Sequence, residues 1–304
     1  MMTLREKNSV LDRINSELAE SYGDRFGVND QVNDTVPSRA EVIGVTGMLL
    51  EILFPGFEGA GNYPNTRVLL GTVMRELSEL IGRALRHSKG GVCADCQADC
   101  VSKSDELVIK LLDALPGIRE VLKADVEAAY KGDPAARNYD EIILSYPGVK
   151  AVAIQRLAHE LFTAGVPLIP RMMTEYAHSE TGIDIHPGAT LGKGIFIDHG
   201  TGVVIGETAV IGDNVRIYQG VTLGAVSFPK NACGMLIKGL RRHPTIGSNV
   251  TIYSGASVLG DVTIGDDSII GGNVWLTESL PPGTKITALP PEHRMKFLNG
   301  KKEQ

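Results

Sequence analysis

An aliphatic residue recurs at every sixth position over much of the C-terminal half of the chain, and this period constrains the fold more than any other feature. A fixed hexapeptide period is the sequence signature of a parallel β-helix. In such a helix three hexads, about 18 residues together, make one triangular coil. We therefore predict that residues 181–280 form a left-handed parallel β-helix with these side chains pointing inward. The aliphatic runs are Ile185, Leu191, Ile197 and Val203, then Ile205, Ile211, Ile217 and Leu223, then Ile246, Ile252, Val258, Ile264, Ile270 and Leu276.

The period breaks twice, and both breaks carry histidine and charged residues. The step from Val203 to Ile205 slips the phase just after the Asp198-His199 pair. The gap from Leu223 to Ile246 carries AVSFPKNACGMLIKGLRRHPT, which has no hexad period and must leave the prism as a loop at about 225–244. The intact coils carry mostly small polar residues. We therefore expect the chemistry at the two breaks.

The first 180 residues show helical rather than hexad spacing, so the fold class we expect is α+β in two parts. We predict a helical N-terminal domain over 1–180, the β-helix over 181–280 and a C-terminal tail over 281–304. Ser104 is a candidate N-cap, and Pro116-Gly117 is expected to end the helix that follows it. The predicted helices cover Val68–Ala84, Leu107–Leu115, Ile118–Tyr130, Val149–Ala164 and Arg171–Ser179.

Composition excludes several classes of protein. The 304 residues carry a formal net charge of −6 with no block of Lys or Arg, which argues against a nucleic-acid or anionic-membrane partner. No apolar run reaches the ~18 residues of a membrane span, so we expect a soluble cytoplasmic protein. Four cysteines do not make a secreted disulfide framework.

Five strings of the sequence resemble serine acetyltransferases, the enzymes that transfer acetyl from acetyl-CoA to the hydroxyl of L-serine. The resemblance spans roughly residues 120–276 and implies O-acetyl-L-serine and CoA as products, a place in cysteine biosynthesis, and acetyl-CoA as co-substrate without a required metal. The strings are GDPAA (132–136), YPGVKAVAIQRLAHELF (146–162), DIHPGATLGKGIFIDHGTGVVIGETAVIG (184–212), QGVTLGA (219–225) and RHPTIG (242–247).

His199 is the candidate general base. A serine hydroxyl is a poor nucleophile at neutral pH, and a neutral imidazole within hydrogen-bond reach can take its proton. A carboxylate on the far ring nitrogen would orient that imidazole. The resemblance gives the two roles to His199 and Asp184, which the coil period places in adjacent layers. The alternative is structural: His199 caps a corner and Asp184 satisfies a backbone amide.

An amino-acid substrate needs partners for both of its charges. By resemblance, Asp133 and Asp198 hold the ammonium, while Arg242 and His243 bind the carboxylate; arginine suits carboxylates because it can donate two parallel bonds. Asp133, Arg242 and His243 each have a simpler explanation. Asp133 before Pro134 fits a helix N-cap, and the other two fit a solvated loop cation and a turn residue before proline.

Acetyl-CoA is expected, by resemblance, in a groove between neighbouring prisms. The candidate lining residues are small and equally explained as coil corners: Gly224, Ala225, Gly255 and Ala256. Two features depart from the family pattern. The loop between QGVTLGA and RHPTIG is unusually long, and the tail reads PPGTKITALPPEHRMKFLNGKK in place of a Gly-Val-Pro-Ala segment.

Coil edges must be covered, and packing three prisms side by side is a common solution. We therefore expect a homotrimer, and the resemblance adds a dimer of trimers joined through the helical half. It also implies L-cysteine as a feedback inhibitor in the serine pocket. Relatives that dock on cysteine synthase end in Ile, whereas this chain ends in Gln304, so that complex is not expected.

Three further readings remain open. His87, Cys93, Cys96 and Cys100 could bind zinc, although cysteines at such spacing also pack on one helix face. The same scaffold could acylate a sugar or another hydroxyl; such an enzyme would share His199 but would not need Asp133, Asp198 and Arg242 together. A scaffold that binds CoA esters without turnover would release no thiol.

Overall fold

The computed structural model describes residues 2–22, 36–57, 65–88, 94–227, 229–231 and 233–289, without the side chains of 94–98. The chain divides into two compact units, Met1–Val36 and Pro37–Gln304. The first contains α1 (Leu4–Tyr22), which buries none of its residues. The second contains everything else described below. The boundary expected at residue 180 is a change of secondary structure inside this second unit.

Six helices precede the first strand of the second unit in the described part of the chain, which confirms the helical prediction. Within the described residues, no helix combines the length and apolar content needed to cross a membrane. The helices are α2 (Arg39–Leu53), α3 (Thr66–Ser88), α4 (Ala94–Gly132), α5 (Tyr139–Ser145), α6 (Pro147–Thr163) and α7 (Ile169–Thr181).

The predicted stop at Pro116-Gly117 is wrong, because α4 continues through Pro116. An interior proline removes a hydrogen bond and costs about 3 kcal/mol. The cost is offset by one unbroken apolar face on either side of it, since each fully buried side chain of this kind contributes about 1.5–3 kcal/mol. That face includes Leu111, Leu115, Ile118 and Leu122, all buried. Ser104 is consequently not an N-cap: it lies inside α4 and donates to the carbonyl of Val101 at 2.8 Å.

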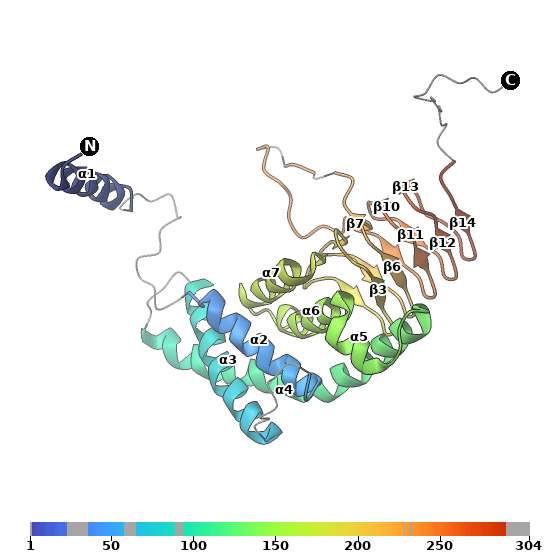
Figure 1. Cartoon of the computed structure of the whole chain (residues 1–304), viewed down its shortest axis with the longest axis horizontal. Coiled ribbons are helices and arrows are strands. Elements are labelled where there is room, and N and C mark those ends of the chain that lie inside the picture. Colours follow the sequence, from blue (N-terminus) through green and yellow to red (C-terminus); the bar gives the residue numbers. More distant parts are fainter. Residues whose placement is uncertain are drawn as a thin grey trace. The chain divides into compact units, whose positions relative to one another are not determined.

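The second part is a parallel β-solenoid, and the prediction of a left-handed β-helix of hexapeptide repeats is confirmed at the level of fold class. Its short strands form three sheets, called here faces A, B and C (Figure 1). Face A has β1 (Asp184–Ile185), β4 (Val204–Ile205), β7 (Thr222–Gly224), β10 (Ser257–Leu259) and β13 (Trp275–Leu276). Face B has β2 (Thr190–Leu191), β5 (Val210–Ile211), β8 (Thr245–Ile246) and β11 (Thr263–Ile264). Face C has β3 (Phe196–Asp198), β6 (Arg216–Tyr218), β9 (Thr251–Ile252), β12 (Ile269–Ile270) and β14 (Lys285–Ile286).

The aliphatic residues of the hexads fill the prism as predicted, and all of them except the partly buried Leu191 are buried. The register also locates both breaks. Ile205 lies opposite Leu223, 18 residues further on, whereas Ile185 lies opposite Ile205, 20 residues further on. The first coil is therefore longer, and its extra residues lie in the corner between faces C and A. The second break leaves the prism between β7 and β8, as expected, and stands out from the stack in Figure 1.

A buried ion pair joins the helices to the first coil. Arg156 on α6 donates to both carboxylate oxygens of Asp125 on α4, at 2.9 and 3.1 Å. The same guanidinium reaches the carbonyls of Leu191 and Gly192, and Asp125 accepts from the backbone N–H of Ile195. Burial raises the pKa of Asp125, and the positive charge of Arg156 opposes that rise. Two helices and a corner of the prism thus share one fully bonded polar centre.

The helices also approach the prism closely at Gly148, in the first turn of α6. A Cβ on this residue would lie 2.3 Å from the carbonyl oxygen of Ile197, so only glycine allows the contact. The carbonyl belongs to β3, which is the strand that leads to Asp198 and His199. α6 and the strand before the first break are therefore held in a fixed register.

We predict that Asp125→Ala lowers the free energy of unfolding by about 3–5 kcal/mol, because it leaves the Arg156 charge buried without its partner. The matched control is Glu120→Ala, which removes an exposed partner of Lys123 on the same helix and should change stability by less than about 1 kcal/mol. Urea unfolding followed by circular dichroism measures both. Equal effects of the two variants would contradict a special role for the buried pair.

Candidate functional site

The longer first coil makes His199 project from the prism. The corner between β3 and β4 turns through left-handed backbone at His199, Gly200 and Gly202, with φ of 58°, 77° and 79°. The His199 side chain is 70% exposed, and its Nδ1 lies 3.6 Å from Oδ1 of the mostly buried Asp198. An exposed imidazole beside a carboxylate on rigid backbone suits a proton acceptor.

Asp133 and Tyr146 lie beside this corner. The hydroxyl of Tyr146 donates to Oδ2 of Asp133 at 2.5 Å, and the backbone N–H of Ala135 donates to Oδ1 at 2.8 Å. The pKa of Asp133 is lowered, first by the Tyr146 hydrogen bond and also by the charge of His199. We call Asp133, Tyr146, Asp198 and His199 the histidine corner. It contains three of the residues predicted for catalysis or ammonium binding, together with Tyr146, which was not predicted.

The explanation of Asp133 as a helix N-cap is wrong. Asp133 directly follows α4, which ends at Gly132, and the next helix begins at Tyr139 with Asn138 as its N-cap. The carboxylate of Asp133 caps a turn instead, through the Ala135 N–H. The Asp-Pro pair therefore marks the end of one helix rather than the start of another, and it leaves Oδ2 to Tyr146.

Arg242 and His243 lie at the returning end of the loop, against the corner that follows β4. The guanidinium of Arg242 pairs with Oε2 of Glu207 at 2.5 Å. The hydroxyl of Thr208 accepts from the backbone N–H groups of both loop residues, at 3.0 and 3.1 Å. We call Glu207, Thr208, Arg242 and His243 the arginine corner. It fixes the backbone of the loop at the two residues predicted to bind a carboxylate.

The imidazole of His243 is held neutral and in one tautomer. Burial, followed by the charge of Arg242, lowers the pKa of His243 to about 4. Its Nδ1 accepts from the backbone N–H of Thr208 at 3.1 Å. Because a backbone N–H can only donate, the ring proton must lie on Nε2. His243 therefore presents a neutral N–H donor. Its ring packs on Gly206, where a Cβ would lie 2.1 Å from the imidazole.

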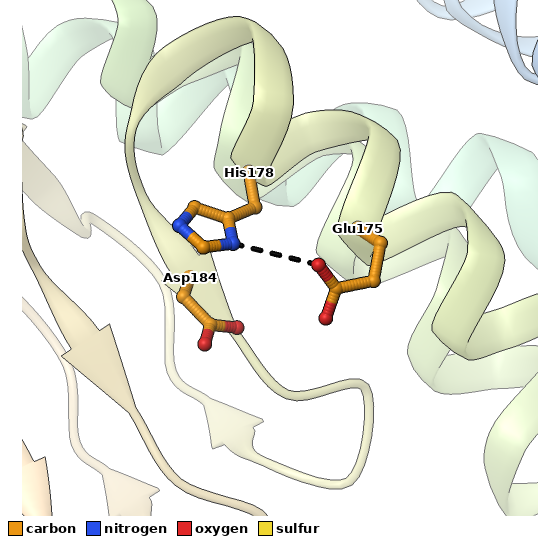
Figure 2. A group of neighbouring side chains, drawn as sticks. All are labelled: Glu175, His178 and Asp184. Carbon is orange, nitrogen blue, oxygen red and sulfur yellow. Dashed lines mark ion pairs between the residues drawn. The ribbon is translucent and has the colours of Figure 1, made fainter.

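Asp184 does not contact His199 in this structure. It begins β1 and faces α7, where Nη1 of Arg171 lies 3.7 Å from its Oδ1. Figure 2 shows Asp184 next to Glu175 and His178, whose own ion pair spans 3.5 Å. Ligand atoms of these three residues lie within 4.8 Å of one another, the one such grouping among the described residues. Arg171 already pairs with both carboxylates, which disfavours a second cation there.

The two corners lie at opposite ends of the same strand. The histidine corner precedes β4 (Val204–Ile205) and the arginine corner follows it. Within the described residues, no hydrogen bond or ion pair between side chains joins the two. One chain thus separates the groups predicted for the ammonium end of a substrate from those predicted for its carboxylate end.

The residues predicted to line a CoA groove divide in the same way. Gly224 and Ala225 lie where face A ends, whereas Gly255 and Ala256 lie where it begins. Ala256 is fully buried, and Gly255 occupies a left-handed corner with φ 70°. Both observations fit coil corners, and CoA contacts at these four positions stay a prediction. A cavity of about 600 Å³ lies between the loop and the corner where face A ends, and Glu207 and Arg242 are part of its lining.

The predicted zinc ligands are only partly described. Cys93 lies outside the described residues, as does the side chain of Cys96. Cys100 is buried on α4 within the hydrophobic core, as a packed cysteine would be. The zinc site stays a prediction.

Comparison with known proteins gives a consistent result. Residues 243–278 match the family model of the bacterial transferase hexapeptide (six repeats). The "Serine acetyltransferase, plasmid" of Synechococcus elongatus is 45% identical over 288 residues, covering 91% of this chain and 90% of the relative. Among solved structures, serine acetyltransferase isoform 3 of Entamoeba histolytica in complex with cysteine has a TM-score of 0.71 at 35% identity, over 96% of each chain. The Neisseria gonorrhoeae serine acetyltransferase in complex with serine has a TM-score of 0.54 at 29% identity, over 81% of this chain and 95% of the other.

Proposed function

The chain belongs to the serine acetyltransferase family, and from that premise we infer that it transfers the acetyl group of acetyl-CoA to the hydroxyl of L-serine. The products are O-acetyl-L-serine and CoA. The observation that carries this proposal is the exposed His199 at the lengthened corner, with the carboxylates of Asp198 and Asp133 beside it. A general base next to two anionic groups suits an acceptor that carries both a hydroxyl and an ammonium.

The reaction needs no covalent enzyme intermediate. Neutral His199 takes the hydroxyl proton as the serine oxygen attacks the thioester carbonyl. The tetrahedral intermediate collapses by breaking the carbon–sulfur bond, and the imidazolium returns its proton to the leaving thiolate of CoA. Asp184 remains the predicted orienting carboxylate. Its present partner is Arg171 on α7, so this role requires its side chain to reach a histidine that it does not contact in the single chain.

The two corners suit the two charged ends of L-serine. The carboxylates of Asp133 and Asp198 offer acceptors to the ammonium, and the pKa of Asp133 is held low by its hydrogen bonds. Arg242 offers a guanidinium to the substrate carboxylate, with His243 as a neutral N–H donor. Glu207 pairs with Arg242 in the structure and so orients the Arg242 guanidinium.

We propose that the site forms between two copies of the chain. The ammonium and carboxylate of serine are attached to the same carbon, whereas the two corners of one chain lie at opposite ends of β4. When three prisms pack around a three-fold axis, one corner of each prism lies against a different corner of its neighbour. Face A suits this packing, because Val204 is 39% and Trp275 71% exposed. Acetyl-CoA is proposed to lie in the resulting grooves, and a dimer of trimers stays a prediction.

Substituting His199 tests the proposed chemistry. His199→Ala should lower kcat by about 10²–10⁴-fold, the usual contribution of a general base. Thiol release from acetyl-CoA, with and without L-serine, measures turnover. CoA binding by calorimetry and the melting temperature should stay close to wild type, because the His199 side chain is largely exposed in the single chain. Full serine-dependent activity in this variant would rule out the assigned base.

Mixing inactive chains tests the shared site. Chains carrying His199→Ala and chains carrying Arg242→Ala, co-expressed with different tags and purified through both, should recover activity at one of the three interfaces of each mixed trimer. The control pair is His199→Ala with Asp133→Asn, which damage the same corner and should not complement each other. A site contained in one chain would give no recovery in either mixture.

L-cysteine is proposed as an inhibitor in the serine pocket. It carries the same ammonium and carboxylate with a thiol in place of the hydroxyl, and the Entamoeba histolytica relative was solved in complex with cysteine. Increasing L-cysteine should raise the apparent KM for L-serine and leave kcat unchanged. A fall in kcat at a constant KM for L-serine would place the inhibitor elsewhere.

A further inference from the structure

We propose that Tyr146 is a positioning residue of the serine pocket, holding the carboxylate of Asp133 in the orientation that receives the substrate ammonium beside His199. The proposal rests on the proposed function and adds a residue to it. Tyr146 would touch no reacting atom. Its effect would pass through Asp133 alone.

Both oxygens of Asp133 are restrained, and each keeps a lone pair for a ligand. Oδ2 accepts from the Tyr146 hydroxyl at 2.5 Å, and Oδ1 accepts from the Ala135 N–H at 2.8 Å. A carboxylate oxygen can accept about two hydrogen bonds, so the ammonium can approach either oxygen. Without the hydroxyl, one backbone bond would hold a side chain on an otherwise open turn after α4. The carboxylate could then rotate away from the histidine corner.

Tyr146 is itself tightly placed. It is the C-cap of α5 and the N-cap of α6, and it packs against a hydrophobic cluster that includes Ile142, Val149 and Phe196. Two residues later, Gly148 lies against the carbonyl of Ile197, where no Cβ fits. Tyr146 is thereby held in register with β3, the strand that leads to His199. The hydroxyl links a turn of the helical part to the catalytic corner of the prism.

The electrostatics agree with this geometry. The hydrogen bond to Asp133 raises the pKa of Tyr146 to about 12, so the hydroxyl keeps its proton and donates it. The charge of Asp198 also contributes to that rise, which places Tyr146 close to the second predicted ammonium ligand. The same hydrogen bond is the largest cause of the lowered pKa of Asp133. The pair therefore keeps an anion available for the ammonium.

The test uses the full chain and four variants: Tyr146→Phe, Asp133→Asn, the double variant, and Tyr139→Phe as a control whose ring is 49% exposed and lies outside both corners. Tyr146→Phe should raise the KM for L-serine about tenfold, the typical cost of a hydrogen bond to a charged group. The KM for acetyl-CoA, kcat at saturating L-serine and the melting temperature should change by little. In the Asp133→Asn background, Tyr146→Phe should change the KM for L-serine less than about twofold, because coupled residues are not additive.

Each other result overturns the proposal. An unchanged KM for L-serine in Tyr146→Phe, or in Asp133→Asn, removes the positioning role. Equal effects of Tyr146→Phe in the wild-type and Asp133→Asn chains would show a purely structural tyrosine. So would a lower kcat and a lower melting temperature with an unchanged KM for L-serine. Absence of serine-dependent thiol release in the wild-type chain is a different failure, which falls on the proposed function itself.

Discussion

The prism exists because, on each of its three faces, one aliphatic side chain of a coil stacks on the equivalent side chain of the next coil. Each buried side chain of this kind contributes about 1.5–3 kcal/mol, and a shift of one residue in a strand would turn it toward solvent. Extra residues therefore cannot be absorbed within a strand and must leave at a corner. Both insertions in this chain obey that constraint, at residues 199–202 and at the loop between β7 and β8. The side chains proposed for binding and catalysis lie at these two insertions, because the regular coils cannot accommodate extra residues.

The helical part is joined to the first coil, next to the site, by a few close contacts. Arg156 and Asp125 join α6 and α4 to the first coil, and Gly148 sets the depth at which α6 meets β3. Since α4 runs without interruption to Gly132, its docking also determines where the next residue, Asp133, is placed. The polar centre of Arg156 and Asp125 thus contributes to the placement of a proposed ammonium ligand relative to the proposed base.

The sequence predicted the features that follow from the hexapeptide period. It did not predict features that depend on packing between residues far apart in the chain. The hexads fixed which residues point inward, and the two breaks marked both corners. The stop at Pro116 was mispredicted because burial of an apolar face outweighs the local cost of proline. The alternative explanation of Asp133 as a helix N-cap failed for a related reason, since the end of α4 follows from its packing. No local signal indicates that the Tyr146 hydroxyl meets a carboxylate 13 residues earlier in the chain. Nor does the spacing show that Asp184 faces Arg171, because α7 brings that cation in.

Separation of the two corners has a consequence for how the site can be controlled. The histidine corner is built from the first coil and the helices, whereas the arginine corner is built from a loop end held by Thr208 and Glu207. If the two meet only across neighbouring prisms, the distance between base and carboxylate ligand is set by packing of face A and not by either corner. Each corner can then remain rigid while the pocket adjusts through the interface. A three-fold arrangement would repeat the same pocket at every interface, so a change in prism packing would act on all three sites at once.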